Sequence, residues 1–288
     1  MTRPATSRER ILHAVLGRTR RRRIVSYAAL TIGAAVAIDA LFIEPFALEI
    51  TRHHVRAPVD APITIAHLTD LHTQGLGRRE RLLLERLEAE KPDLIVITGD
   101  TVDGGDLEPA RELMTALRAP LGVWVVRGNW ENWQPPRAGG QTAPQSEAAF
   151  YTSVGARFLV NEGQLARRDV WIAGLDDPMS GHASPAAALA GAPAGVFTIV
   201  LVHSPEGFGP GLAPGFKVDL ALAGHTHGGQ VRLPFVGPLW LPPGSGGFVA
   251  GWYESGGSRM YVSRGIGTSI LPVRFLCSPE LALITVAP

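Results

Sequence analysis

From residue 61 onward, short apolar runs alternate with amphipathic stretches. The first run, "PITIAHLTD", is rich in β-branched residues and stops at Asp70, and "RRERLLLERLEAEKP" follows with leucines at helical spacing. "DLIVITGD" then ends at Asp100, "EPARELMTALRAP" is a second helical pattern closed by Pro120, and "GVWVVRGN" ends at Asn129. Strands that alternate with helices predict a largely parallel sheet covered on both faces.

Four later apolar runs predict further strands, and they read "VWIAGL", "FTIVLVH", "DLALAGH" and "MYVSRG". Proline- and glycine-rich pieces at 134–144 and 241–247 indicate loops inside one domain rather than linkers. The chain has 288 residues, of which 45% are hydrophobic. This is enough apolar material for a sizeable core, so disorder over the whole chain is excluded.

Residues 24–43 are a mostly apolar run of about the length that a helix needs to cross a bilayer. Five arginines between Arg18 and Arg23 precede it and should stay in the cytoplasm. We therefore expect a cytoplasmic tail over 1–23, a single transmembrane anchor over 24–43 in the inner membrane, and a periplasmic domain over 44–288. Two alternatives stay open: a signal peptide cleaved after "AVA" at 35–37, and a buried core helix. The length of the run favours the retained anchor.

The formal net charge of +1 hides an asymmetry. Residues 1–23 contain eight arginines and one glutamate, so they carry +7 and the rest of the chain carries −6. A net-acidic domain does not suit nucleic-acid binding, and we expect no nucleic-acid partner. It does suit a protein that gathers carboxylates around cations. Cys277 is the only cysteine, which excludes an intrachain disulfide and a thiolate zinc cluster.

Side chains suited to metal binding end the predicted strands. The loops at the carboxyl ends of strands in an open α/β sheet converge on one crevice. The residues in these positions are Asp70, His72, Asp100, Asp103, Asn129, His203, His225 and His227. Oxygen and nitrogen ligands without sulfur suit paired Mn, Fe or Zn better than Mg or Ca. Each short motif alone is typical of an ordinary turn, but their ordered occurrence favours one metal site.

Taken together, these motifs resemble the calcineurin-like metallophosphoesterases, whose signature is D-x-H, GD-x-x-D/N, GNH-D/E, a lone H and GH-x-H. The matching segments are "DLH" at 70–72, "GDTVD" at 99–103, "GNWE" at 128–131, "LVHSP" around His203 and "GHTH" at 224–227. "FIEPFALEI", "AGLDDP", "GHTHGGQ" and "YVSRGIGTS" resemble the membrane-anchored bacterial branch of the YkuE and YaeI type, which has been linked to UDP-2,3-diacylglucosamine hydrolysis in lipid A synthesis. The resemblance implies a two-sheet α/β-β/α sandwich over 44–288, preceded by one transmembrane helix.

The resemblance also implies a centre of two divalent metal ions, Mn or alternatively Fe or Zn. Asp70, His72 and His227 would hold one ion and Asn129, His203 and His225 the other, with Asp100 bridging them. Asp100, Asn129 and His203 are then the expected catalytic residues, in a reaction in which a hydroxide formed at the two ions attacks phosphorus. Asp103 and Glu131 are interpreted as supporting or turn-capping residues, or else as solvated loop carboxylates.

The chain departs from the family pattern at Trp130, where the family usually has a histidine. An indole has one N–H donor and does not titrate, so it cannot protonate a leaving group. This predicts a phosphoanhydride or an activated ester as substrate. Trp130 either forms a wall of the site, against a base or an acyl chain, or packs in a core cluster with Trp124 and Trp133.

Two classes of function remain. The first is a binuclear-metal-dependent hydrolase of phosphoester or pyrophosphate bonds, acting on a lipid-linked or nucleotide substrate such as UDP-2,3-diacylglucosamine. The second is an inactive binding or scaffold protein of the same fold. The presence of all seven expected ligands favours the enzyme. Arg232, Arg264 and Arg274 are candidates for phosphate contacts, with Arg264 and Trp130 as the expected substrate residues, although surface charge is the ordinary role of arginine.

Overall fold

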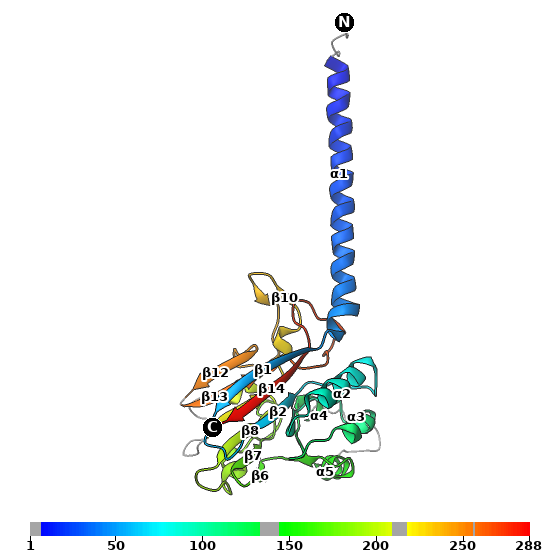
Figure 1. The fold of residues 1–288 in the computed structure, drawn as a ribbon. Coiled ribbons are helices and arrows are strands. Elements are labelled where there is room, and N and C mark those ends of the chain that lie inside the picture. The colour runs from blue at the N-terminus through cyan, green and yellow to red at the C-terminus, as the bar shows by residue number, and fades with distance from the viewer. Residues whose placement is uncertain (1–6, 133–143, 209–217, 256) are drawn as a thin grey trace.

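Two six-stranded sheets face each other in the computed structural model, which describes residues 7–132, 144–208, 218–255 and 257–288 (Figure 1). The first sheet has the order β1 (Glu49–Arg56), β14 (Glu280–Ala287), β2 (Ile63–Leu68), β3 (Leu94–Thr98), β4 (Val123–Val126) and β5 (Arg157–Phe158). The second has the order β12 (Gly251–Ser255), β13 (Ser258–Val262), β9 (Leu220–Ala223), β8 (Phe197–Leu201), β7 (Val170–Gly174) and β6 (Glu162–Arg167).

Most neighbouring strands run parallel. β2 to β5 form a parallel series, while β14 is antiparallel to β2 and parallel to β1. In the second sheet the parallel series runs from β13 through β9 and β8 to β7, with β12 and β6 antiparallel at its edges. Because the parallel strands are buried on both faces, their sequences are continuous apolar runs rather than alternating ones.

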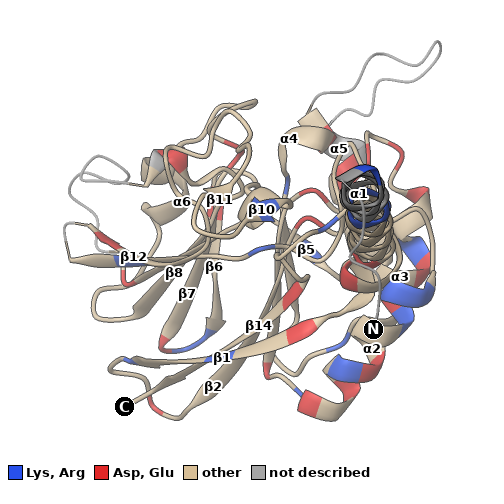
Figure 2. Cartoon of the chain, turned by 90° about the horizontal axis from the view of Figure 1, so that it is seen from above, with Lys and Arg blue, Asp and Glu red and all other residues tan. Residues whose placement is uncertain are grey.

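The main core lies between the two sheets. It contains Ile65 and Val96 from the first sheet and Ile199 and Leu220 from the second, each at most 1% exposed. Helices α2 (Arg78–Glu90), α3 (Arg111–Ala116) and α5 (Pro144–Ser153) cover the outer face of the first sheet. The short helix α6 (Pro185–Leu189) packs on the outer face of the second. Seen along α1, the second sheet, the first sheet and helices α2 and α3 follow one another as layers (Figure 2).

The two helices predicted after the first two strands are confirmed as α2 and as the 3-10 turn η3 (Glu108–Ala110) with α3. In α2, Leu83 and Leu87 are four residues apart, which places both on the face that packs on the sheet. Glu80 accepts a hydrogen bond from the backbone N–H of Gly77 at 3.0 Å and so caps the helix start. The seven strands predicted from apolar runs are confirmed as β2, β3, β4, β7, β8, β9 and β13.

The alternating pattern predicted a largely parallel sheet covered on both faces, and it did not indicate that one of the covering layers is a second sheet. Each sheet covers one face of the other, which is the two-sheet arrangement that the family resemblance implied. Residues 241–247 form the expected loop. The other predicted loop, 134–144, lies outside the described residues except for Pro144, where α5 begins.

The N-terminal helix α1 (Ser7–Ile38) projects away from the domain and continues into a π-helical turn, η1 (Asp39–Ile43), and a 3-10 turn, η2 (Glu44–Phe46) (Figure 1). Within Arg20–Phe46 it is long and apolar enough to cross a membrane, with a mean hydropathy of 1.9, and the apolar window is not buried. The interpretation as a buried core helix is therefore wrong. A membrane anchor and a signal sequence both fit this helix.

Candidate metal centre

The seven expected ligands come from the ends of strands in both sheets and meet in one place. The first sheet places Asp70 and His72 after β2, Asp100 after β3 and Asn129 at the start of the short helix α4 (Asn129–Asn132), which follows β4. The second sheet places His203 after β8, and His225 and His227 after β9. All seven are buried, with exposed fractions between 0% and 5%.

Five of these residues have a left-handed backbone, which is uncommon outside glycine and concentrates at functional sites. Their φ angles lie between 44° and 71°, and the residues are Asp70, His72, Asp100, His225 and His227. The glycines beside them allow close approach of the loops. A Cβ on Gly99 would lie 2.6 Å from His203 Nδ1, and one on Gly224 would lie 2.6 Å from Asp70 Oδ2. The strand-to-loop turns therefore require glycine in the "GD" and "GH" motifs.

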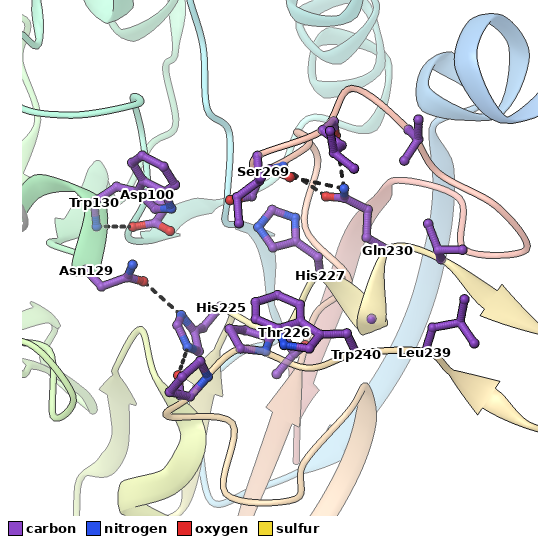
Figure 3. A pocket seen from close by; sticks show the side chains of 17 residues that line it. Asp100, Asn129, Trp130, His225, Thr226, His227, Gln230, Leu239, Trp240 and Ser269 are labelled. Atoms are coloured by element: carbon purple, nitrogen blue, oxygen red, sulfur yellow. Dashed lines mark hydrogen bonds between the residues drawn. The ribbon is translucent and has the colours of Figure 1, made fainter.

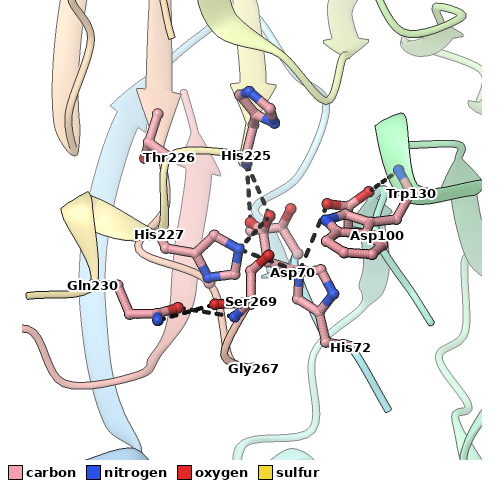
Figure 4. A network of polar contacts seen from close by, with 12 residues as sticks. Asp70, His72, Asp100, Trp130, His225, Thr226, His227, Gln230, Gly267 and Ser269 are labelled. Carbon is pink, nitrogen blue, oxygen red and sulfur yellow. Dashed lines mark hydrogen bonds and ion pairs between the residues drawn. The ribbon is translucent and has the colours of Figure 1, made fainter. Parts of the chain in front are cut away.

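One group of ligands surrounds the side-chain oxygen of Asn129. This Oδ1 lies 2.8 Å from His225 Nδ1 (Figure 3). It lies 2.9 Å from His203 Nε2, and the two nitrogens are 3.2 Å apart. The other group joins Asp70, His72 and His227 (Figure 4). There the His72 and His227 Nε2 atoms are 3.2 Å apart, and His227 Nε2 lies 3.4 Å from Asp70 Oδ1.

Asp100 lies between the two groups. Its Oδ2 is 3.2 Å from His203 Nε2 and 3.6 Å from His72 Nε2. Its Oδ1 accepts a hydrogen bond from the backbone N–H of Trp130 at 3.0 Å, which fixes the plane of the carboxylate (Figure 4). One carboxylate thus faces a histidine from each group, as expected for a bridging ligand.

The outer hydrogen bonds of three histidines determine which ring nitrogen carries the proton. His72 Nδ1 donates to Asp103 at 2.6 Å, His203 Nδ1 donates to the carbonyl of Thr98 at 2.7 Å, and His225 Nε2 donates to the carbonyl of Pro243 at 2.6 Å. Because each of these partners only accepts, the assignment leaves the lone pair of the other ring nitrogen directed into the site.

This tautomer assignment makes the cluster one of acceptors. His203 Nε2, His225 Nδ1 and Asn129 Oδ1 lie within 3.2 Å of one another, and when both histidines are neutral none of the three atoms carries a proton. Three lone pairs at this separation repel unless a proton on His203 Nε2 or a metal cation lies among them, and nitrogen and oxygen donors are the ligands of a divalent transition metal. The residues therefore fit two metal ions, with Asp70, His72 and His227 on one side and Asp100, His203 and His225 on the other.

The electrostatics of the cluster are dominated by burial and by mutual pairing. Burial disfavours a charged imidazole at His203, yet the neighbouring Asp100 carboxylate raises its pKa well above the usual value. At His227 burial and the charge of His72 both lower the pKa well below that value. Burial, reinforced by Asp100, raises the pKa of Glu131 to about 7.

Glu131 and Asp103 both support the ligand loops. Glu131 is 5% exposed and accepts hydrogen bonds from the backbone N–H groups of Asp100, Thr101 and Gly128 at 3.1, 2.6 and 2.9 Å. It thereby ties the loop after β3 to the loop after β4. Asp103 orients the ring of His72. Glu131 is thus a buried supporting residue rather than a solvated loop carboxylate, whereas Asp103 is exposed to solvent and also holds His72.

Trp130 belongs to the wall of a cavity beside the ligands (Figure 3). Its ring meets His72 edge to face, with centroids 5.8 Å apart and planes at 88°. Trp124, in contrast, is fully buried between the two sheets, and Trp133 lies outside the described residues. The structure thus favours the wall interpretation over a core cluster.

The cavity has a volume of about 470 Å³ and extends from Asp100, Asn129 and Trp130 along an apolar wall. Residues 239–243 and 269–273 supply that wall, namely Leu239, Trp240, Pro242, Pro243, Ser269, Ile270, Leu271 and Val273. This wall was not predicted from the sequence. The available signal was the presence of large apolar side chains in the proline-rich stretches "PLWLPP" and "SILPV".

No arginine is among the described residues that line the cavity. Arg264 pairs with Glu49 at 2.7 Å and with Glu280 at 3.3 Å, so the structure does not bring it to the site. Arg232 is half-buried and donates to the carbonyl of Gly228 at 3.3 Å.

Arg274 is fully buried, and its guanidinium donates to backbone carbonyls, including those of Gly265 and Cys277. Burial lowers the pKa of Arg274 to about 10. The interpretation of Arg274 as a surface charge is therefore wrong.

Comparison with known proteins agrees with this geometry. The family model for the calcineurin-like phosphoesterases matches residues 63–229, which include all seven ligands. The chain is 33% identical to the metallophosphoesterase YkuE of Bacillus subtilis (strain 168) over 89% of this chain and 91% of YkuE, and 28% identical to the phosphodiesterase YaeI of Escherichia coli (strain K12) over 92% and 98%. Among solved structures, TT1561 of Thermus thermophilus is similar with a TM-score of 0.44 and 13% identity over 71% of this chain and 90% of that chain. The chain belongs to the calcineurin-like phosphoesterase family.

Proposed function

We propose that this protein hydrolyses phosphoester or pyrophosphate bonds with two divalent metal ions, preferably Mn, and that its substrate is an amphiphile at the membrane such as UDP-2,3-diacylglucosamine. The cluster of Asn129, His203 and His225 carries the proposal, because its donor atoms fit a divalent cation and it opens directly into a cavity. Ions bound there would neutralise charge on the phosphoryl group and lower the pKa of water to about 7.

The side chains of the site are oriented before any substrate arrives. Asp103, Thr98 and Pro243 fix three imidazole rings, and the N–H of Trp130 fixes Asp100. Burial of these groups excludes bulk water and strengthens the electrostatic interactions among them. Such preorganisation favours charge development on a phosphoryl group without reorganisation of the protein.

Trp130 supports a substrate whose leaving group needs no proton. Its ring lines the cavity where the family usually has a histidine, and an indole cannot act as an acid. Without an acid, an alkoxide leaving group would depart unprotonated, and it is a poor leaving group because the pKa of its alcohol is about 15. A phosphate monoester leaves readily, since its second pKa is about 6. The proposal therefore favours a pyrophosphate or an activated phosphodiester.

The apolar wall supports an amphiphilic substrate. Cavities of a few hundred Å³ with apolar walls and a few polar groups are typical binding sites. Trp130 and Trp240 supply aromatic surface for a base, while Ile270 and Leu271 supply aliphatic surface for an acyl chain. A nucleotide without a lipid is the nearer variant, since it would use only the aromatic part.

We further propose that α1 is a retained anchor and that the domain faces the periplasm. The arginines at 18–23 precede the apolar stretch and favour a cytoplasmic N-terminus. An inactive scaffold protein remains the second function, but nothing in such a role would require seven buried ligand residues to converge.

A substrate screen with the full chain in detergent micelles tests the function. The Mn-loaded protein is offered UDP-2,3-diacylglucosamine, bis-p-nitrophenyl phosphate and simple nucleotides, with Asp100→Asn as the matched inactive control. We expect turnover of the lipid-linked pyrophosphate to be the fastest and to disappear in the control. Absence of turnover of every substrate at full metal occupancy would favour the scaffold.

A further inference from the structure

The exposed large apolar side chains of the domain gather on the face from which α1 leaves. They come from the hairpin formed by β10 (Arg232–Leu233) and β11 (Gly237–Pro238), from the loop after it, and from the loop before β14. We call these residues the apolar rim, and they are Leu233, Phe235, Val236, Leu239, Trp240, Ile270, Leu271 and Leu276. Outside α1, η1 and this rim, only Leu165 and Trp252 among the described residues are similarly exposed.

The rim lacks the charges that normally solvate a protein surface. Residues 233–253 and 265–273 contain no lysine, arginine, aspartate or glutamate. Val236, Trp240 and Ile270 are 69%, 59% and 75% exposed. Soluble proteins rarely expose a contiguous apolar patch of this kind, so the rim indicates contact with another apolar phase.

The backbone of the rim is built at a conformational cost. Phe235 and Ile270 have a φ of 64° and Leu276 a φ of 51°. A bulky or β-branched residue is seldom found in this region of conformational space. The chain thus keeps three large apolar side chains on the surface at positions where glycine or asparagine would be more stable.

Hydrogen bonds fix the rim to the base of α1. The backbone N–H of Arg274 donates to the carbonyl of Ala40 at 3.0 Å. The Glu44 carboxylate accepts from the backbone N–H groups of Leu276 and Cys277, at 2.8 Å in the case of Leu276. The loop before β14 and the end of the N-terminal helix therefore form one unit, and the hairpin reaches toward the same side (Figure 1).

A second set of bonds ties the hairpin to this loop. Gln230 donates through Nε2 to the carbonyls of Ser269 and Leu271, and its Oε1 accepts from the backbone N–H of Ser269 (Figure 3). The N–H of Arg232 donates to the carbonyl of Phe275 at 2.9 Å. All parts of the rim are thus held relative to the helix that would cross the membrane.

We propose that the apolar rim rests in the outer surface of the bilayer that α1 spans, so that the cavity opens at the level of the lipid headgroups. The inference rests on the proposed function and specifies its substrate class: a phosphate compound whose apolar part stays in or near the bilayer. Leu239, Trp240, Ile270 and Leu271 belong both to the rim and to the cavity wall, which makes one apolar path from lipid to metal ligands. Tryptophan is well suited to such an interface.

Lipid quenching measures the position of the rim without reference to activity. The full-length variant Val236→Cys is labelled with an environment-sensitive fluorophore in vesicles of phosphatidylethanolamine and phosphatidylglycerol that contain nitroxide-labelled lipid. The native Cys277 is buried and should not react. Leu165→Cys is the matched control, because Leu165 is 39% exposed and lies on β6, at the end of the domain away from α1 (Figure 1). We expect strong quenching at 236 and little at 165.

Equal quenching at the two positions would overturn the proposal. Weak quenching at position 236 that depends on the protein concentration at constant lipid would also overturn it, since a second copy of the chain would then cover the rim. Neither outcome depends on whether the protein is an enzyme, so a failure of the proposed function is distinguishable from a failure of this inference.

A kinetic comparison tests the consequence for the substrate. Phe235 lies in the rim but does not line the cavity. Phe235→Asp should lower kcat/KM about tenfold for p-nitrophenyl hexadecyl phosphate embedded in vesicles, because a charge replaces a lipid-facing ring. The variant should leave kcat/KM for soluble bis-p-nitrophenyl phosphate unchanged, and Leu165→Asp should change neither value. Equal loss on both substrates in Phe235→Asp would contradict the proposal.

Discussion

Asp103 should control the affinity of one metal ion and not of the other. Its carboxylate touches the ligand set at one point, the 2.6 Å hydrogen bond to His72 Nδ1, and His72 belongs to the group with Asp70 and His227. Loss of an outer partner of a histidine ligand typically costs a factor of about 10 to 100 in metal affinity. Asp103→Ala should therefore lower the binding affinity for one metal ion by this factor and leave the affinity for the other unchanged.

Two variants separate the charge of Asp103 from its hydrogen bond. In Asp103→Asn the amide oxygen can still accept from Nδ1–H, so the ring keeps its orientation and loses only the negative charge beside it. We expect a smaller loss of affinity in this variant than in Asp103→Ala. Asp106→Asn, at an exposed carboxylate in the same loop, controls for a general disturbance of that loop.

The assay is equilibrium dialysis of the full chain in detergent against graded Mn²⁺, with the bound metal counted by mass spectrometry. Two separate binding steps should appear in the wild type, and only one should move in the Asp103 variants. Hydrolysis of bis-p-nitrophenyl phosphate should recover when Mn²⁺ saturates the weakened step. If both steps move together, or if neither moves, the assignment of His72 to one ion and the orienting role of Asp103 are wrong.

Four further predictions address the bridge, the leaving group, the core and the topology. Asp100→Asn should lower the binding affinity for both metal ions and lower turnover by several orders of magnitude, since Oδ2 faces a histidine of each group. Two tightly bound ions, with activity within a factor of about ten of the wild type, would contradict the bridging role. Trp130→His should raise kcat/KM for an alkyl phosphodiester by a factor of about 10² to 10⁴ and should change kcat/KM for a pyrophosphate little. An equal change for both substrates would mean that Trp130 has no leaving-group role. Burial lowers the pKa of His67 to about 4, so the free energy of unfolding should fall by about 3 kcal/mol as the pH falls from 6.5 toward 4. Urea unfolding followed by tryptophan fluorescence measures this loss, and the same pH dependence in His67→Gln would refute the reasoning. A reporter fused after Pro288 should be active in the periplasm while the protein stays in the membrane after a carbonate wash, whereas a cytoplasmic signal would reverse the orientation and release into the soluble periplasm would indicate cleavage.

The ligand loops could be predicted from sequence because their signals are local. Asp70, Asp100 and Asn129 each end a continuous apolar run, and such runs are buried strands whose ends converge at one edge. Histidines at the ends of later runs extend the same argument to the second sheet. The convergence of the two sheets came only from the family resemblance, since nothing in the periodicity of one strand indicates which face another sheet covers.

The strands β1 and β14 and the cavity wall escaped prediction because their signals are not local. β1 alternates half-buried and exposed residues such as Arg52 and Arg56, and its place is fixed by pairing with a strand more than 200 residues later in the chain. The wall combines Trp240 with Ile270, from two loops that Gln230 connects. A large apolar residue in a proline-rich loop does not reveal by itself that another loop will lie beside it.

The position of β14 has a consequence for the order of events in the cell. This strand lies between β1 and β2 and pairs with both, although it follows every other described strand in the chain. Until Glu280–Ala287 leaves the ribosome, the two early strands keep unpaired edges, and the first sheet cannot close. If α1 directs the chain across a membrane, as we propose, the domain would cross before its first sheet is complete. Pairing of β14 with both β1 and β2 is then the step that completes the first sheet.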